Sequence, residues 1–244
     1  MTSSTLAAGS GLLLRPAGER FHSTTSWLES WHTFSFAGHF DPEWMGFGPL
    51  LVINDDTIAP GQGFGFHPHR DMEIVTVMVE GELHHRDSLG HTEVLRAGEV
   101  QRMSAGTGVV HSEINGGSVP CRLLQIWIEP SRRGIPPAYE QKPFAIGSQW
   151  TLLLDPGRSG EAMAIERPVR LWRARPQAGE ELLLPVSEGC NAWLQMISGS
   201  LQMEAEGSPD SLLQQGDGLG FTAGRLRSLR AGAEGADVLL FELP

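Results

Sequence analysis

The sequence is poor in several residue types on which whole classes of protein depend. It has only two cysteines in 244 residues, Cys121 and Cys190. Two cysteines build no disulfide framework, and they fit small buried or half-buried side chains in a reducing compartment. Lys142 is the only lysine, and the net charge is −11. An acidic chain without a basic stripe disfavours direct binding to nucleic acid, which depends on Lys and Arg against phosphates.

Long hydrophobic runs are also lacking. No apolar run approaches the eighteen residues of a transmembrane helix, so no membrane partner is expected. The segment 1–14 has no basic residue before its short apolar patch, which argues against a secretory signal. These features predict a cytoplasmic protein.

Long amphipathic helices are absent from the pattern too. The chain instead shows short β-patterned segments with Gly-rich turns, such as the continuously apolar or β-branched run 74–79. This pattern predicts an all-β protein of the barrel or jelly-roll type. A small barrel offers its mouth or interior as a place where ligand groups can converge.

The second half of the chain repeats the first. Three segments align without a gap at one offset of 118 residues, the separation of Gly81 and Gly199. The matched segments are 79–83 with 197–201, 95–99 with 213–217, and 103–106 with 221–224. A fixed offset indicates duplication of a β unit. We therefore expect two domains, residues 1–134 and 135–244, with a proline-containing linker at 135–148.

Two polar pairs at spacing i, i+2 mark the candidate site. One pair is His67 and His69, and the other is His111 and Glu113. Residues i and i+2 of a strand point to the same side, about 7 Å apart. Two such strands side by side would aim three imidazoles and one carboxylate into one space. That ligand set suits a divalent transition metal and leaves positions open for water, dioxygen or a substrate oxygen.

Other residues near these pairs compete for the same role. Glu73 is the rival carboxylate, but in an extended strand it would lie about 13 Å beyond His69, too far to share an ion unless the chain bends back. His84, His85 and His91 lie near a predicted hairpin and are interpreted as solvated residues.

The chemistry is confined to the first half. All nine histidines occur at or before His111. At the offset of 118 residues, the four proposed ligands correspond to residues with no affinity for a transition metal, namely Pro185, Ser187, Leu229 and Ala231. One metal per chain is therefore expected, in the first domain.

These residues resemble the pirin family of two-domain cupins. The resemblance is carried by Trp31–Phe36, Met45–Leu50, Gly61–Glu73, His84–Ser88, Gly106–Asn115 and Pro137–Gln141. It is strong from Ser26 to Gln141 and elsewhere concerns length and duplication. The chain departs from general cupin motifs at Ser104, where proline is usual, and pirins share this departure.

The resemblance implies two tandem cupin domains, of which only the first binds metal. Pirin ligands correspond to His67, His69, His111 and Glu113, which favours Glu113 over Glu73. The implied metal is iron, Fe(II), although three imidazoles and a carboxylate also accept manganese, cobalt, nickel or copper. The implied activity of several members is quercetin 2,3-dioxygenase, with a flavonol and O2 as substrates.

Three functions follow as hypotheses. The first is a dioxygenase that opens the central ring of a flavonol, in which Glu113 is the catalytic residue that takes the proton of the 3-hydroxyl, and Phe66 with nearby aromatic residues lines a flat pocket. The second is a redox-responsive metal-binding protein that acts through contacts with an unnamed protein partner, as in pirins that resemble transcription cofactors. The third is another cupin reaction, such as an isomerisation or a different oxygenation.

Overall fold

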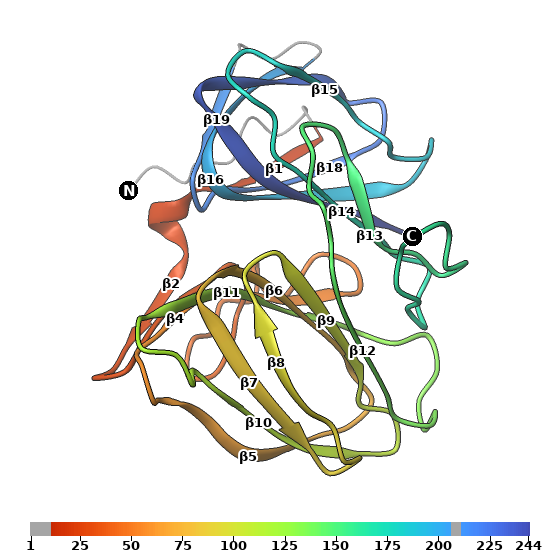
Figure 1. Ribbon diagram of the computed structural model, residues 1–244. Coiled ribbons are helices and arrows are strands. Elements are labelled where there is room, and N and C mark those ends of the chain that lie inside the picture. The colour runs from red at the N-terminus through yellow and green to blue at the C-terminus, as the bar shows by residue number, and fades with distance from the viewer. Residues whose placement is uncertain (1–10, 206–210) are drawn as a thin grey trace. The chain divides into compact units, whose positions relative to one another are not determined.

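The computed structural model describes residues 11–205 and 211–244, and nearly all of its regular structure is β (Figure 1). The strands are β1 (Leu12–Arg15), β2 (Phe21–Thr24), β3 (Leu28–His32), β4 (Leu50–Ile58), β5 (Gly63–His69), β6 (Glu73–Glu80), β7 (Glu82–Asp87), β8 (Thr92–Arg96), β9 (Glu99–Ser104), β10 (Val109–Ile114), β11 (Cys121–Ile128), β12 (Ala138–Pro143), β13 (Thr151–Leu154), β14 (Arg170–Ala174), β15 (Glu181–Leu183), β16 (Asn191–Ala205), β17 (Ser211–Gln214), β18 (Gly218–Thr222) and β19 (Leu226–Leu243). One 3-10 helix, Ala17–Glu19, follows β1. Within the described residues, no helix is long and apolar enough to cross a membrane.

The contacts divide the chain into two units. The first unit comprises residues 21–144 and 165–167. It contains a seven-stranded sheet, ordered β12-β9-β6-β11-β4-β3-β2, and a four-stranded sheet, ordered β5-β10-β7-β8 (Figure 1). The central strand β6 has the sequence EIVTVMVE and is buried over its first six residues, as expected of a β-branched strand with a partner on each side.

Of the residues that the structure describes, the second unit comprises 11–20, 145–164, 168–205 and 211–244. Its strands form one eight-stranded sheet with the order β1-β18-β16-β19-β14-β13, while β15 adds to β19 and β17 adds to β16. The two long strands β16 and β19 pair along most of their length, with register shifts that bend the ribbon.

The duplication predicted from the sequence is present at the level of single hydrogen bonds. Gly98 N donates to Met78 O at 3.3 Å, and Gly216 N donates to Met196 O at 3.1 Å. Both pairs are related by the same offset of 118 residues, and both glycines have a positive φ, 86° and 87°. A left-handed residue at this turn requires glycine, which explains why the sequence retains it in both halves.

The units differ from the predicted domains 1–134 and 135–244 at both ends. Residues 12–15 form β1, which pairs with β18 of the second unit. Residues 138–143, expected in a linker, form β12 and pair with β9 of the first unit. Both segments form backbone hydrogen bonds with the strand at the edge of a sheet, whose N–H and C=O groups would otherwise be unpaired. This pairing explains why each segment belongs to a different unit from the one predicted.

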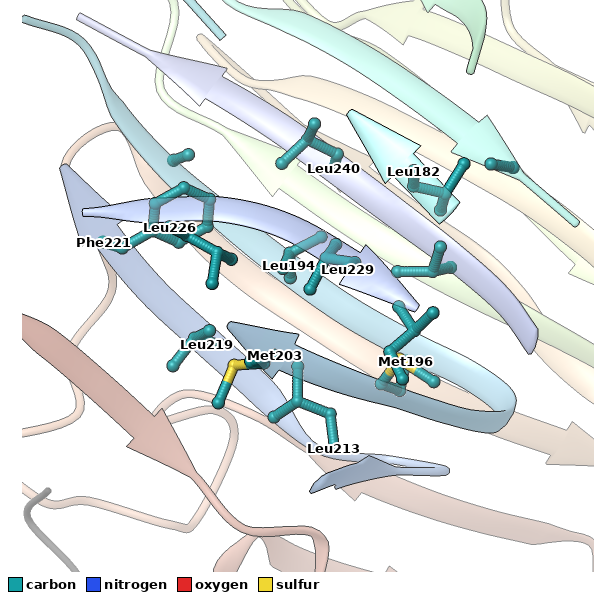
Figure 2. Packing of buried hydrophobic residues seen from close by; sticks show 14 of the residues in the cluster. Leu182, Leu194, Met196, Met203, Leu213, Leu219, Phe221, Leu226, Leu229 and Leu240 are labelled. Atoms are coloured by element: carbon teal, nitrogen blue, oxygen red, sulfur yellow. The ribbon is translucent and has the colours of Figure 1, made fainter. Parts of the chain in front are cut away.

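The second unit fills its interior with hydrocarbon where the first unit carries polar side chains. Leu229 and Ala231, which correspond to His111 and Glu113, are buried in the hydrophobic cluster that Figure 2 shows around Leu194, Met196 and Leu229. A space filled in this way has no imidazole or carboxylate and no room for an ion.

Candidate metal centre

Two neighbouring strands of the four-stranded sheet bring the first three candidate ligands together. In the β5–β10 pair, His111 lies opposite His67, and His69 follows on the same side of β5. The ring centroids of the three imidazoles lie 4.4–4.9 Å apart. One nitrogen from each ring lies within 4.8 Å of those of the other two. The structure thus unites three histidines that the sequence places up to 44 residues apart.

The nitrogen atoms are oriented as ligands. His67 Nε2 and His111 Nε2 are 3.0 Å apart. His67 Nδ1 donates to Gly65 O at 2.8 Å, which leaves the lone pair of Nε2 directed at the cluster. Two imidazole nitrogens at this distance can share one proton or bind one divalent cation, so the donor set fits a transition metal.

The protonation states also suit metal binding. Burial, followed by the proximity of His111 and His67, lowers the pKa of His69 to about 4. Burial, followed by the proximity of His67 and His85, lowers the pKa of His111 to about 3. Both rings are therefore neutral near pH 7, the form that coordinates a metal.

Glu113 occupies the inner side of the cluster. A register shift between His111 and Glu113 in the β5–β10 pair sets Glu113 opposite Phe64. The carboxylate is 2% exposed, and its Oε2 accepts a hydrogen bond from Gln125 Nε2 at 2.8 Å. Glu113 joins His111 and His85 in a second group whose ligand atoms lie within 4.8 Å of one another. The complete set His67, His69, His111 and Glu113 stays a prediction.

Glu73, the rival carboxylate, lies elsewhere. It belongs to neither of the two groups of candidate ligands found among the described residues. Its Oε2 accepts a hydrogen bond of 2.7 Å from Ser104 Oγ, which in turn accepts one from Arg102. Burial raises the pKa of the Glu73 carboxyl above its ordinary value. Ser104, at the position where cupins usually carry proline, thus serves to anchor this buried acid.

The imidazole cluster opens into a cavity of about 340 Å³. Aromatic and polar side chains line it, and they include Phe36, Phe64, Trp127, His32, Asn54, Asp56, Gln125 and the candidate ligands His67, His69 and Glu113. The Trp127 ring meets the His69 ring edge-on at 5.0 Å. The volume is within the range of about 300–1,000 Å³ typical of small-molecule sites.

Two expectations about the surroundings were wrong. Phe66 is 67% exposed and lies outside this cavity, because it directly precedes His67 and adjacent strand residues face opposite sides. His85, expected to be solvated, is fully buried beside His111, with ring centroids 5.4 Å apart. The alternation of β7 carried that information, since His85 and His84 must face opposite sides and one of them must face inward.

Within the described residues, one β unit is lined by a cluster of imidazoles and the other is filled with apolar side chains. This arrangement defines a two-domain cupin whose candidate metal centre lies in the first unit. The family model described as Pirin matches residues 15–128, and the model described as Quercetinase C-terminal cupin domain matches residues 152–243. The chain belongs to the pirin family, as the sequence motifs predicted.

Individual relatives agree with this assignment. The chain is 42% identical over 234 residues to quercetin 2,3-dioxygenase of Escherichia coli K12, covering 96% of this chain and 99% of the relative. It is 40% identical to a putative quercetin 2,3-dioxygenase of Pasteurella multocida, covering 95% and 99%. The crystal structure of the bacterial pirin YhhW from Escherichia coli in complex with nickel(II) is similar with a TM-score of 0.89 and 41% identity, covering 96% of this chain and 99% of that one. The chain is thus a metal-binding oxidoreductase of the cupin dioxygenase type.

Proposed function

We propose that this protein is a flavonol 2,3-dioxygenase that holds one ferrous ion in its first unit through His67, His69, His111 and Glu113. The observation that carries the proposal is the convergence of three imidazoles at the edge of an aromatic-lined cavity that also contains a carboxylate. The names of the relatives support flavonol as the substrate class. Both atoms of dioxygen enter the products of a dioxygenase, so the reaction consumes no external reductant.

The bound metal would supply Lewis acidity toward the 3-hydroxyl and carbonyl oxygens of the flavonol, together with redox chemistry toward dioxygen. The three imidazoles hold the ion without adding negative charge. They come from strands of one sheet, so their positions are set by backbone hydrogen bonds and vary little.

We assign the removal of the proton of the 3-hydroxyl to Glu113. Its Oε2 is held by Gln125 Nε2 at 2.8 Å, while Thr76 Oγ1 lies 3.4 Å from Oε1 and 3.0 Å from Gln125 Oε1. Because the Thr76 hydroxyl carries a single hydrogen, its bond to Gln125 leaves Glu113 Oε1 as an available acceptor. A carboxylate fixed at one oxygen and available at the other suits a general base.

The cavity walls suit a flat, hydroxylated aromatic molecule. Trp127 and Phe36, which meet edge-on at 5.4 Å, supply an aromatic surface. His32, Asn54 and Asp56 place polar atoms on the cavity wall, and His32 Nδ1 is bonded to Asn54 Oδ1 at 2.8 Å. An apolar cavity with a few fixed polar groups orients a ligand whose hydroxyls lie at its edges.

Oxygen uptake by iron(II)-loaded protein tests the proposal. Wild-type protein is expected to consume oxygen with flavonols and to remain idle with the matching flavones, which lack the 3-hydroxyl. His67→Ala should abolish uptake and metal retention, whereas His84→Ala should preserve both, because the His84 side chain is 43% exposed and lies outside the cavity. Fully loaded wild-type protein that is idle with every flavonol would refute the proposal and favour a metal-dependent binding role.

A further inference from the structure

A second polar cluster lies directly behind the candidate ligands. It consists of His85 and Asp87 from β7, His91 from the turn that follows, and Tyr139 from β12. In the β10–β7 pair, Glu113 lies opposite His85 and His111 lies opposite Asp87. Directly opposed residues of an antiparallel pair share a face, so the sheet itself sets this cluster against the candidate ligands.

Asp87 is the anchor of the cluster. Its side chain is fully buried, and its Oδ1 accepts the backbone N–H groups of Leu89 and His91 at 2.9 and 3.0 Å. Its Oδ2 accepts His85 Nε2 at 3.1 Å and His91 Nδ1 at 2.9 Å. Burial pulls the pKa of Asp87 upward, but these hydrogen bonds outweigh it and hold the pKa below its ordinary value. An ionised carboxylate only accepts hydrogen bonds, so His85 carries its proton on Nε2.

This tautomer gives His85 a free acceptor. In the neutral ring with a proton on Nε2, Nδ1 keeps a lone pair. That Nδ1 atom is buried and has no hydrogen-bond partner. The ring cannot turn away, because it packs against the Tyr139 ring at 4.8 Å and 30°, and Tyr139 also stacks on His91 at 4.6 Å and 22°.

His111 presents the complementary donor. Its Nε2 faces His67 Nε2 in the imidazole cluster, so coordination through Nε2 leaves the proton on Nδ1. His111 Nδ1 is likewise buried and without a partner. One nitrogen of His85, one nitrogen of His111 and a carboxylate oxygen of Glu113 lie within 4.8 Å of one another, a spacing that one water molecule can bridge. Two rings whose centroids are 5.4 Å apart thus each carry a buried nitrogen without a partner, and the two nitrogens have opposite hydrogen-bonding character.

We propose that His85 is a positioning residue whose Nδ1 accepts a hydrogen bond from the Nδ1–H of His111. This bond fixes the His111 ring with Nε2 toward the metal. Asp87 holds His85 in the required tautomer. The carboxylate of Asp87, the imidazole of His85, the ligand imidazole of His111 and the metal then form one connected chain. Histidine ligands almost always donate their second N–H in this way, and loss of such a partner costs 10–100-fold in metal affinity. The inference rests on the proposed metal site.

Matched substitutions at position 85 separate this role from packing. The amide oxygen of Asn occupies roughly the place of the imidazole Nδ1, whereas Leu has a similar size and no acceptor. Zinc(II), which has no redox chemistry, is the probe, and competition with a chromophoric chelator gives its affinity. His85→Leu is expected to bind zinc 10–100-fold more weakly than wild type. His85→Asn is expected to stay within about threefold of wild type, in keeping with a retained acceptor.

The spectroscopic readout is the His111 Nδ1 proton. In zinc-loaded protein labelled with ¹⁵N-histidine, wild type and His85→Asn should show this N–H protected from solvent exchange, and His85→Leu should lose the protection. If His85→Leu does not fold, His85→Gln replaces it, because Gln places its amide near Asp87 and leaves the Nδ1 position empty.

The controls distinguish failure of the inference from failure of the proposed site. One possible result is that His111→Ala loses zinc affinity while the acceptor-free variant at position 85 binds zinc as tightly as wild type. This result would support the metal site and overturn the role of His85. Zinc affinity that does not depend on His111 would remove the site on which the inference rests, and the inference with it.

Discussion

The carboxyl group of Asp56 predicts an unusual dependence of stability on pH. Asp56 is 2% exposed in the wall of the cavity, and its Oδ1 has no hydrogen-bond partner. Burial is the largest of the effects that raise its pKa from 3.8 to about 7. A hydrogen bond from Ser30 opposes the rise, and the charges of Asp55 and Glu113 add to it.

The sign of the effect follows from proton binding. Between pH 3.8 and about 7 the folded chain keeps the Asp56 proton that the unfolded chain releases. The stabilising contribution is therefore full at low pH and is lost as the pH rises through this window. At about 1.4 kcal/mol per pKa unit, ionised Asp56 costs the folded state about 4 kcal/mol. About 2.5 kcal/mol of this loss falls between about pH 5 and about pH 8.5.

Urea denaturation of wild type and Asp56→Asn across this range measures the effect. A chelator is present throughout, because a cation beside Glu113 would itself lower the pKa of Asp56. The free energy of unfolding of wild type should fall by about 2.5 kcal/mol relative to Asp56→Asn between about pH 5 and about pH 8.5. The comparison of slopes removes any constant cost of the substitution. Parallel curves for the two proteins would refute the assignment of a buried, protonated Asp56.

Three further predictions concern the site. Glu113→Gln should lower metal retention or abolish oxygen uptake, while Glu73→Gln should leave the metal bound; release of the metal by the Glu73 variant alone would reverse the ligand assignment. Gly63→Ala should destabilise the protein by more than about 2 kcal/mol in urea, because φ is +151° and the added Cβ would collide with the backbone of Glu113; an unchanged midpoint would contradict this. Trp127→Leu should raise KM for flavonol about tenfold or more, because a lost aromatic contact typically costs about 1.5 kcal/mol. The control variant Phe66→Leu should leave KM unchanged. Equal effects of the two substitutions would argue against the cavity as the substrate site.

The fold and the first three candidate ligands could be predicted from the sequence, because both depend on local rules. Strand alternation and the fixed offset between Gly81 and Gly199 predicted the duplicated β units. Alternation also predicted that His67 and His69 face the same way. The same offset predicted that Leu229, the counterpart of His111, is not a metal ligand, and Leu229 lies in the hydrophobic cluster of the second unit.

What the sequence did not predict depends on pairing between strands. That β1 joins the second unit and β12 the first is decided by sheet edges, which no local pattern encodes. The burial of His85 depends on β7 lying beside β10, and the exposure of Phe66 on the direction of β5. Asp56 entered the cavity only once β4 was placed in the opposite sheet.

One metal ion per chain is expected among His67, His69, His111 and Glu113 in the first unit. Anomalous diffraction from crystals of iron(II)-loaded protein, recorded on both sides of the iron absorption edge, tests this expectation most directly. We expect a single peak about 2.0–2.2 Å from three Nε2 atoms and one oxygen of Glu113. No peak at this cluster, or a tightly bound second ion in the unit that carries Pro185, Ser187, Leu229 and Ala231, would contradict the account.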